Sequence, residues 1–343
     1  MTESSDRRAF FKQAAAGAAA IGAAAVPFLR AGDETTGEKR KDTNVDEQER
    51  LPIVDTHEHL WDLTKFNLPW TKGNEVLGRS FVTRDYLEAT KGLNVVKSVY
   101  MEVDVDPAQQ VQEAEYVIDL CRRDDNPMVA AVISGRPASG DFKAYIMKYK
   151  DSPYIKGVRQ VLHGPSNPPG FCLDRQFVKS VQLLGELGMS FDLCLRSGEL
   201  ADGEMLVAQC PRTRFIVDHC GNMDVTVADA KPRQVWLDGM KALAQHDNVV
   251  CKISGIVVTA REDWKTADLA PNMVFSMETF GPDRRMFAGD WPVCTLRASY
   301  RQWVGALKEI VREMKMPPAD QRKLFHDNAV RFYGLKDKGY RAS

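Results

Sequence analysis

Two histidines and one distant aspartate are the residues of this chain best suited to shared chemistry. His57 and His59 lie in the apolar run that starts at Ile53, and Asp290 lies far along the chain in the segment Ala-Gly-Asp-Trp-Pro. Alternate side chains of a strand face the same side, so His57 and His59 would project together with Asp55 behind them. Two imidazoles at this spacing can share a metal ion or hold one developing anion. A carboxylate from a distant strand could complete that metal site and act as a general base.

The elements that must position these residues alternate between short apolar runs and segments of helical period. We predict eight strands: Ile53–His59, Val95–Asp104, Met128–Gly135, Ile155–Leu162, Ser190–Leu195, Arg214–Cys220, Val249–Gly255 and Arg285–Asp290. Helical patterns lie between them, such as Asp174–Leu187, and the clearest is the last long one, which starts at Tyr300.

Eight strands, each followed by a helix, are what a closed barrel requires. We therefore predict an α/β protein with a single-domain (β/α)8 TIM barrel, closed by C-terminal helices between Pro317 and Tyr333. An open doubly wound sheet also alternates strand and helix, and it stays the second possibility. No Gly-x-Gly-x-x-Gly opens a helix, which excludes the usual nucleotide-binding variant of that fold.

The barrel prediction gathers the polar candidates in one region. Active sites of such barrels lie at the C-terminal ends of the strands. Seven residues are expected on that rim: His57, His59, Glu102, His163, Arg196, His219 and Asp290. Chance would scatter these residues, so their collection at one end indicates an enzyme.

Composition excludes several other classes of function. The chain has 343 residues, 44% of them hydrophobic, which suffices for one large domain. A formal net charge of -1 gives no electrostatic case for binding nucleic acid or an anionic membrane surface. The seven cysteines include no Cys-x-x-Cys, and Cys194, Cys220 and Cys251 fall in apolar runs, so we expect reduced, structural thiols.

The first 50 residues are expected to lie outside the folded domain. Residues 1–30 contain the pair Arg7-Arg8, the adjacent phenylalanines Phe10 and Phe11, a lysine and an Ala/Gly-rich stretch, a pattern typical of a twin-arginine signal peptide. The stretch is too short and too rich in Ala and Gly for a stable transmembrane span. Residues 31–50 are strongly polar and are predicted to be a disordered linker, which leaves 51–343 for the barrel.

An export signal of this kind implies a location and a partner. We predict an exported, periplasmic protein that is recognised by the twin-arginine export machinery and acts on a small-molecule substrate. A small-residue cleavage site could lie at 23–25, although cleavage does not follow from the sequence. The alternative is an ordinary disordered tail in which two arginines stand together by chance.

Eight segments, in order along the chain, resemble the amidohydrolase superfamily. They are Val54–Asp62, Gly157–Leu162, Phe191–Leu195, Val217–Gly221, Lys252–Gly255, Phe280–Arg285, Phe287–Pro292 and Asn328–Tyr333. A single His-x-His would be a weak signal, but the ordered set spans most of the region after residue 51. It is similar to the amidohydrolase-2 branch, which includes sugar-acid lactonases and a pyrone dicarboxylate lactonase.

The resemblance implies a catalytic cluster of four residues: His57, His59, His219 and Asp290. Asp290 and His219 would be catalytic, while His57, His59 and Asp290 would hold one divalent metal, with zinc the expected ion. A metal-free site stays open, because some lactonases of this branch work without a metal. The fourth strand offers Arg159 where the superfamily carries a lysine or glutamate, so a two-metal centre bridged by a carbamylated lysine is not expected.

Five further residues are candidates for substrate contacts: Glu102, Arg159, His163, Arg196 and Trp291. Arg159 and Arg196 are fixed-charge donors that could hold a substrate carboxylate or hydroxyl groups, and pairing with Asp192 or Asp218 is equally open. Glu102 could contact substrate or serve as a structural partner. The tryptophan could line a sugar pocket or pack in the barrel rim.

The predicted function is hydrolysis of a lactone of a sugar acid or a related carboxylated ring. A water deprotonated by Asp290 would attack the carbonyl, and His57 and His59, cationic or holding one metal, would stabilise the oxyanion. Two alternatives stay open. One is a metal-dependent decarboxylase of the same branch, and the other is an exported carbohydrate-binding protein that has the site but no turnover.

Overall fold

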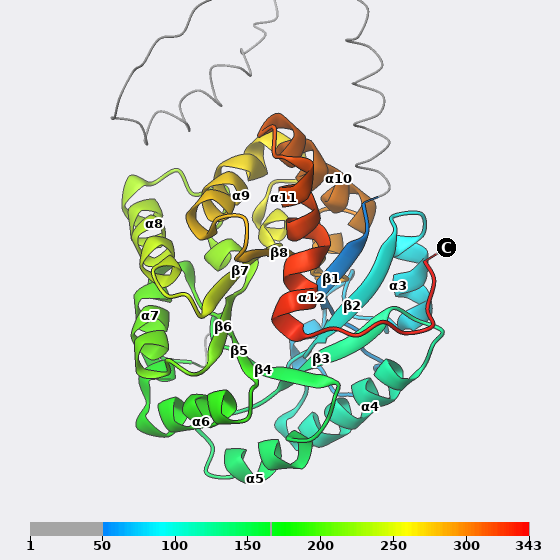
Figure 1. The fold of residues 1–343 in the computed structure, drawn as a ribbon, viewed down its shortest axis with the longest axis vertical. Coiled ribbons are helices and arrows are strands. Elements are labelled where there is room, and N and C mark those ends of the chain that lie inside the picture. The colour runs from blue at the N-terminus through cyan, green and yellow to red at the C-terminus, as the bar shows by residue number, and fades with distance from the viewer. Residues whose placement is uncertain (1–50, 165–166, 343) are drawn as a thin grey trace, which may run out of the picture. The chain divides into compact units, whose positions relative to one another are not determined.

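The computed structural model describes residues 51–164 and 167–342, so the predicted export signal and linker lie outside the described residues. Eight parallel strands form one sheet in chain order, and they curve into a nearly closed barrel surrounded by helices (Figure 1). The strands are β1 Ile53–Glu58, β2 Val95–Met101, β3 Met128–Ser134, β4 Ile155–Val161, β5 Ser190–Cys194, β6 Arg214–Val217, β7 Val249–Ile253 and β8 Arg285–Phe287. The predicted TIM barrel is therefore confirmed.

The strands begin where the sequence predicts and end earlier than predicted. Their first residues agree with the predicted ones throughout, but β2, β6 and β8 each stop three residues short of the predicted end. Just past these three strands, Asp104, His219 and Asp290 have left-handed φ values of 48°, 51° and 53°. Because a left-handed residue turns the backbone out of a ladder, the polar residues predicted at the strand ends lie on turns that follow the strands.

The helices pack around the barrel, and their ends follow local capping rules. They are α3 Thr83–Thr90, α4 Gln110–Arg122, α5 Phe142–Ile146, α6 Arg175–Glu186, α7 Leu200–Gln209, α8 Ala230–Ala244, α9 Thr266–Phe280, α10 Tyr300–Glu313, α11 Pro318–Arg322 and α12 Asn328–Tyr333. Asp174 caps α6 by accepting from the backbone N–H of Gln176, and Ser299 and Gln302 form a capping box that starts α10. Among the described helices, none is long and apolar enough to cross a membrane.

The N-terminal end of the barrel is filled with apolar side chains. Strand residues near the start or middle of their strands pack with the C-terminal helical segment, and all of these side chains are buried. The strands contribute Val54, Val99, Ala130, Val132, Ile216, Val250 and Met286, and the C-terminal segment contributes Ala329, Tyr333 and Leu335. In Figure 1, α12 lies across this end of the strands. The expectation that C-terminal helices close the barrel thus agrees with the structure.

The meeting point of β1 and β8 is held differently from the other strand pairs. An isolated bridge joins Glu58 and Trp291, where each of the other neighbouring pairs forms a ladder. The backbone N–H of His59 donates to Trp291 O at 2.8 Å, and Thr56 Oγ1 donates to Phe287 O at 2.7 Å. Side chains as well as backbone therefore close this seam.

The cysteines agree with a structural role. All seven are free and buried in the described part of the chain.

Candidate active site

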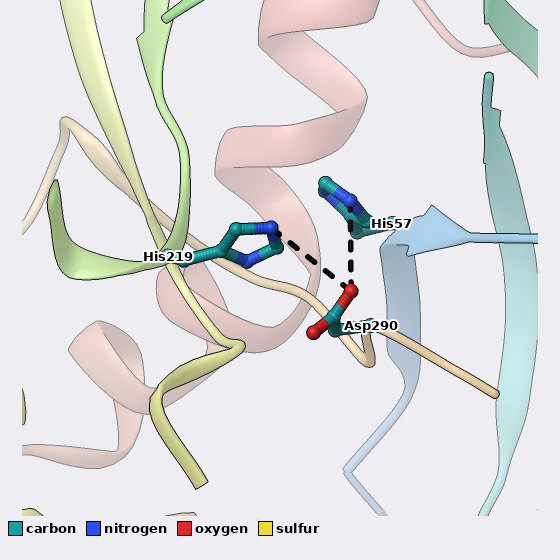
Figure 2. A group of neighbouring side chains, drawn as sticks. All are labelled: His57, His219 and Asp290. Atoms are coloured by element: carbon teal, nitrogen blue, oxygen red, sulfur yellow. Dashed lines mark ion pairs between the residues drawn. The ribbon is translucent and has the colours of Figure 1, made fainter. Parts of the chain in front are cut away.

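Three histidines converge on Asp290 at the C-terminal end of the barrel. Nε2 of His59, His57 and His219 lies 3.4, 3.8 and 4.0 Å from Asp290 Oδ1, respectively. Figure 2 shows His57 and His219 approaching the same carboxylate oxygen from two sides of the barrel. All four side chains are buried. The structure therefore brings together the four residues that the sequence comparison predicted as a cluster.

Left-handed backbone turns, which residues other than glycine seldom adopt, orient two of these side chains. His219 and Asp290 both have left-handed φ values, a conformation that costs about 1–2 kcal/mol for a residue with a Cβ. Gly255, at φ 69° after β7, lies directly against the imidazole of His219. A Cβ on Gly255 would lie 2.3 Å from His219 Nδ1, so only glycine leaves room for the ring.

Hydrogen bonds fix how His59 presents its nitrogen atoms. His59 Nδ1 lies 2.9 Å from the backbone oxygen of Met101, which can only accept, so Nδ1 carries the hydrogen. The lone pair on Nε2 of neutral His59 then faces Asp290 Oδ1 at 3.4 Å. Two acceptors this close need a proton or a cation between them.

The same donor set is suitable for a divalent metal. His57, His219 and Asp290 offer ligand atoms that all lie within 4.8 Å of one another, and His59 adds a fourth candidate. Imidazole nitrogen and carboxylate oxygen are the ligands that zinc takes in catalytic sites. Ser254 Oγ bonds His219 Nδ1 at 2.9 Å and so directs Nε2 of that ring toward Asp290.

Burial favours the neutral form of two of the histidines. Burial lowers the pKa of His57 well below its usual value, and the positive charge of Lys252 lowers it further. Burial also lowers the pKa of His219, although Asp290 opposes the change. A cationic His57, one of the two states expected from the sequence, is therefore disfavoured.

A buried cluster of Lys252, Asp192 and Asp218 lies beside His57, on the interior side of the site. Lys252 Nζ, on β7, lies 2.6 Å from Asp192 Oδ2 and 3.4 Å from Asp218 Oδ1. It also lies 3.4 Å from His57 Nδ1, and all four side chains are fully buried. Sequence reasoning gave Lys252 no role, although a lysine inside an apolar strand is a signal of a buried partner. Removing either charge of such a pair would leave the other uncompensated in the interior.

Arg159 and Glu102 form a second buried pair. Arg159 Nε donates to Glu102 Oε1 at 2.7 Å, and Nη2 donates to Glu102 O at 2.8 Å. Arg159 Nη1 lies 3.2 Å from His57 Nε2 and 3.6 Å from Asp218 Oδ2, so the predicted pairing with Asp218 is present. Glu102 also accepts from the backbone N–H of Asp104 and is fully buried. The structure thus places Glu102 against protein groups.

A cavity of about 740 Å³ opens above the cluster. Six predicted residues line it: His59, Arg159, His163, Arg196, His219 and Asp290. Its other walls are largely apolar, and they include Trp70, Val103, Val161, Ile256, Val258 and Val293. The volume is in the range of small-molecule sites. Trp291 does not line this cavity; it is buried edge-on against Phe81 and Tyr86, with ring centroids 5.4 Å apart in both pairs.

The two arginines of the cavity are already engaged with protein acceptors. Arg196 Nη1 donates to both carboxylate oxygens of Glu199, at 2.8 and 3.0 Å, and Nη2 donates to the backbone oxygens of Gly164 and Asn167. Each guanidinium nitrogen of Arg159 also has a protein partner. A substrate carboxylate would therefore compete with existing bonds at either arginine.

Comparison with known proteins identifies the family of this chain. A protein-family model described as amidohydrolase matches residues 54–335. The chain is 26% identical to L-fucono-1,5-lactonase of Burkholderia multivorans, over 83% of this chain and 96% of that protein. It is 24% identical to L-rhamnono-gamma-lactonase of Scheffersomyces stipitis, over 83% of this chain and 99% of that protein.

Solved structures with similar folds include a hydrolase and a lyase. An amidohydrolase from Burkholderia multivorans with bound zinc superposes with a TM-score of 0.74 at 22% identity, covering 83% of this chain and 100% of that one. The 5-carboxyvanillate decarboxylase of Novosphingobium aromaticivorans, complexed with manganese, superposes with a TM-score of 0.59 at 14% identity, covering 84% and 97%. At these identities the likeness shows the fold.

Proposed function

Because the chain belongs to the amidohydrolase family, we propose that it hydrolyses a lactone, and that its substrate is a neutral lactone of a sugar acid. The observation that carries the proposal is the convergence of three histidines on one carboxylate at the base of the cavity. Water, a general base and oxyanion stabilisation are what ester hydrolysis requires. The two named lactonases that this chain resembles add support.

The state of the cavity arginines favours a neutral ring over the carboxylated ring also considered from the sequence. Arg159 is paired with Glu102 and Arg196 with Glu199, so a substrate carboxylate would meet cations whose charge is already balanced. Burying an unpaired charge costs far more than burying a hydroxyl that finds a partner. Asn222, Ser197 and Thr259 line the cavity and can bond hydroxyl groups of a sugar ring.

In the proposed reaction, Asp290 takes a proton from water, which attacks the ring carbonyl. His219 Nε2, aimed by Ser254, lies beside the same carboxylate and orients the tetrahedral intermediate. Asp290 then returns the proton to the departing ring oxygen, so atoms and charge balance. His57, His219 and Asp290, with His59 as a fourth candidate, are the residues that would hold one divalent metal, with zinc the expected ion. Such a metal, when bound, polarises a carbonyl as a Lewis acid.

Acid release in a pH-stat tests this function with the full chain. The panel contains neutral sugar-acid lactones and, as matched probes, lactones of similar size with an added carboxylate. We expect release far above the spontaneous rate for the neutral lactones and at least about tenfold lower kcat/KM for the carboxylated ones, a gap of about 1.4 kcal/mol. Faster hydrolysis of the carboxylated lactones would overturn the neutral-substrate assignment.

The other two functions give different results in the same preparation. A decarboxylase would release CO2 from an aromatic or unsaturated acid and leave the lactones intact. A binding protein without turnover would give heat of binding in calorimetry and no acid. The paired arginines weigh against the decarboxylase, because the carboxylate of its substrate would meet cations already balanced by Glu102 and Glu199.

We further propose that the protein is exported to the periplasm by the twin-arginine machinery. The support is the Arg7-Arg8 pair with its Ala/Gly-rich stretch, which lies outside the described residues. Replacing both arginines, Arg7→Lys with Arg8→Lys, should retain the chain in the cytoplasm while leaving the activity of the purified protein unchanged. Equal periplasmic amounts of the two chains on fractionation would contradict export by this route.

A further inference from the structure

A fully buried carboxylate lies immediately behind the active site. Asp55 Oδ1 accepts from the backbone N–H of Gly289 at 2.7 Å and of His57 at 3.0 Å. Its Oδ2 accepts from the hydroxyl groups of Tyr86 and Tyr300, both at 2.9 Å. In the described part of the chain no cation forms an ion pair with it, so four neutral donors hold its charge. Such a group is expensive to bury, and its four hydrogen bonds offset that cost.

Asp55 faces the helices, and this corrects the expectation that it stands behind the two histidines on the same face. Its phenol partners belong to α3 and α10, whereas His57 faces Arg159 and the inside of the barrel. The β1–β2 register shifts between Asp55 and Glu58, so the alternation of side chains is interrupted there. A strict period of two therefore does not hold across this motif.

The four bonds of Asp55 span the seam between β1 and β8. One donor, His57 N, belongs to the strand that carries the histidine pair, and another, Gly289 N, belongs to the residue before Asp290. Gly289 fits closely: a Cβ there would lie 2.5 Å from Asp55 Oδ2 and 2.4 Å from Tyr300 Cε2. This carboxylate thus joins the two catalytic segments where an isolated bridge replaces a ladder.

We propose that Asp55 is a positioning residue, which sets the distance between the β1 histidines and Asp290 through its bonds across the seam. The inference rests on the proposed hydrolase function. The His59–Asp290 separation of 3.4 Å depends on how β1 and β8 are held, because the two residues come from opposite sides of the seam. Misplacement of reacting groups by about 1 Å can lower a rate about 100-fold. The two tyrosines brace the carboxylate from α3 and α10.

Variants of the network separate positioning from stability. Asp55→Ala removes all four bonds, while Asp55→Asn keeps the shape and one acceptor oxygen for the two backbone donors. We expect kcat on the best neutral lactone to fall about 100-fold in Asp55→Ala and about tenfold or less in Asp55→Asn, with KM within about threefold in both. Should Asp55→Ala fail to fold, Tyr86→Phe with Tyr300→Phe replaces it, with an expected fall in kcat of about tenfold.

A partly buried phenol away from the seam, Tyr145, is the matched control. Tyr145 Oη donates to Ser134 O at 2.7 Å, so Tyr145→Phe also removes a hydroxyl bond. It should lower the melting temperature while kcat stays within about twofold of wild type. If Asp55→Ala or the double tyrosine variant also keeps kcat within twofold, measured well below its melting temperature, Asp55 is purely structural and the inference is overturned.

A crystal structure of Asp55→Ala, or of the double tyrosine variant if Asp55→Ala does not fold, gives a readout without substrate. We expect a longer distance from His59 Nε2 to Asp290 Oδ1 than the 3.4 Å of the intact network. An unchanged distance would overturn positioning. If wild type hydrolyses no lactone, the proposed function fails, and this distance alone decides the role of Asp55.

Discussion

The two ends of the barrel are built from opposite chemistry on the same eight strands. At the C-terminal end, three histidines and Asp290 cluster at the base of a cavity, and two buried ion pairs lie beside His57. At the N-terminal end, valine, isoleucine and methionine side chains pack with Ala329 and Tyr333 from the C-terminal segment. Residues for chemistry and residues for stability therefore lie at opposite ends of the strands. Substitutions at the polar end should mainly lower kcat, and those at the apolar end should mainly lower the free energy of unfolding.

The largest expected effect is at the polar end. Asp290→Asn removes the proposed base while keeping its size, so kcat should fall about 1,000-fold or more, since general-base catalysis contributes about 10²–10⁴-fold. The melting temperature should change by only a few degrees. The exposed Asp119→Asn on α4 is the control for loss of one carboxylate, and its kcat should match wild type. Near-wild-type turnover by Asp290→Asn would contradict the assignment of chemistry to the polar end.

The apolar end should give the reverse pattern. Val132→Ala deletes two buried methyl groups from the apolar cluster, which should cost about 2–3 kcal/mol of unfolding free energy, from about 0.8 kcal/mol per group plus a cavity term. Denaturant unfolding measures the loss, and kcat of the folded fraction should stay within about twofold. A tenfold fall in kcat without loss of stability would show that the two ends are coupled.

The smallest expected effect is a pH dependence near the polar end. Glu113 on α4 accepts from Tyr100 Oη and from the backbone N–H of Val103, and burial, with a further contribution from Glu102, raises its pKa to about 8. Its unfolded pKa is near 4.5, so the folded state binds the extra proton between these values. The stability it contributes is full below about pH 4.5 and is lost as pH rises through 8.

Glu113→Gln should remove that part of the pH dependence. Between pH 5.5 and 8.5, the melting temperature of wild type should fall by a few degrees more than that of Glu113→Gln. Val132→Ala serves as the control, because its loss of stability should be the same at both pH values. If the melting temperatures of wild type and Glu113→Gln changed equally between pH 5.5 and 8.5, Glu113 would have the same ionisation state at both pH values, and the prediction would fail.

The fold, and the proximity of His57, His59, His219 and Asp290, could be predicted from the sequence because both depend on local patterns and on the order of the strands. Apolar runs set the strand starts, and β-strand ends in a parallel barrel bring polar residues such as His57 and Asp290 to one rim. Several strands were predicted to end too late. Asp104, His219 and Asp290 adopt left-handed φ values just past their strands, and sequence patterns do not associate these residue types in these runs with a left-handed turn.

Pairing of Arg159 with Asp218 was among the predicted possibilities, but the shorter ion pairs could not be predicted, because they depend on which strands meet in space. The pairing of Lys252 with Asp192 joins β7 to β5, and that of Arg159 with Glu102 joins β4 to β2. The orientation of Asp55 depends on the shift in the β1–β2 register between Asp55 and Glu58, and simple alternation of side chains along a strand does not predict such a shift.

The most direct test of the account is the position of label after turnover of the best neutral lactone in H₂¹⁸O. Attack of Asp290-activated water on the ring carbonyl places one ¹⁸O in the carboxylate of the product and leaves the new hydroxyl unlabelled. Mass spectrometry of product fragments distinguishes the two positions. Label in the hydroxyl group, or CO2 released in place of a labelled acid, would contradict hydrolysis at this site.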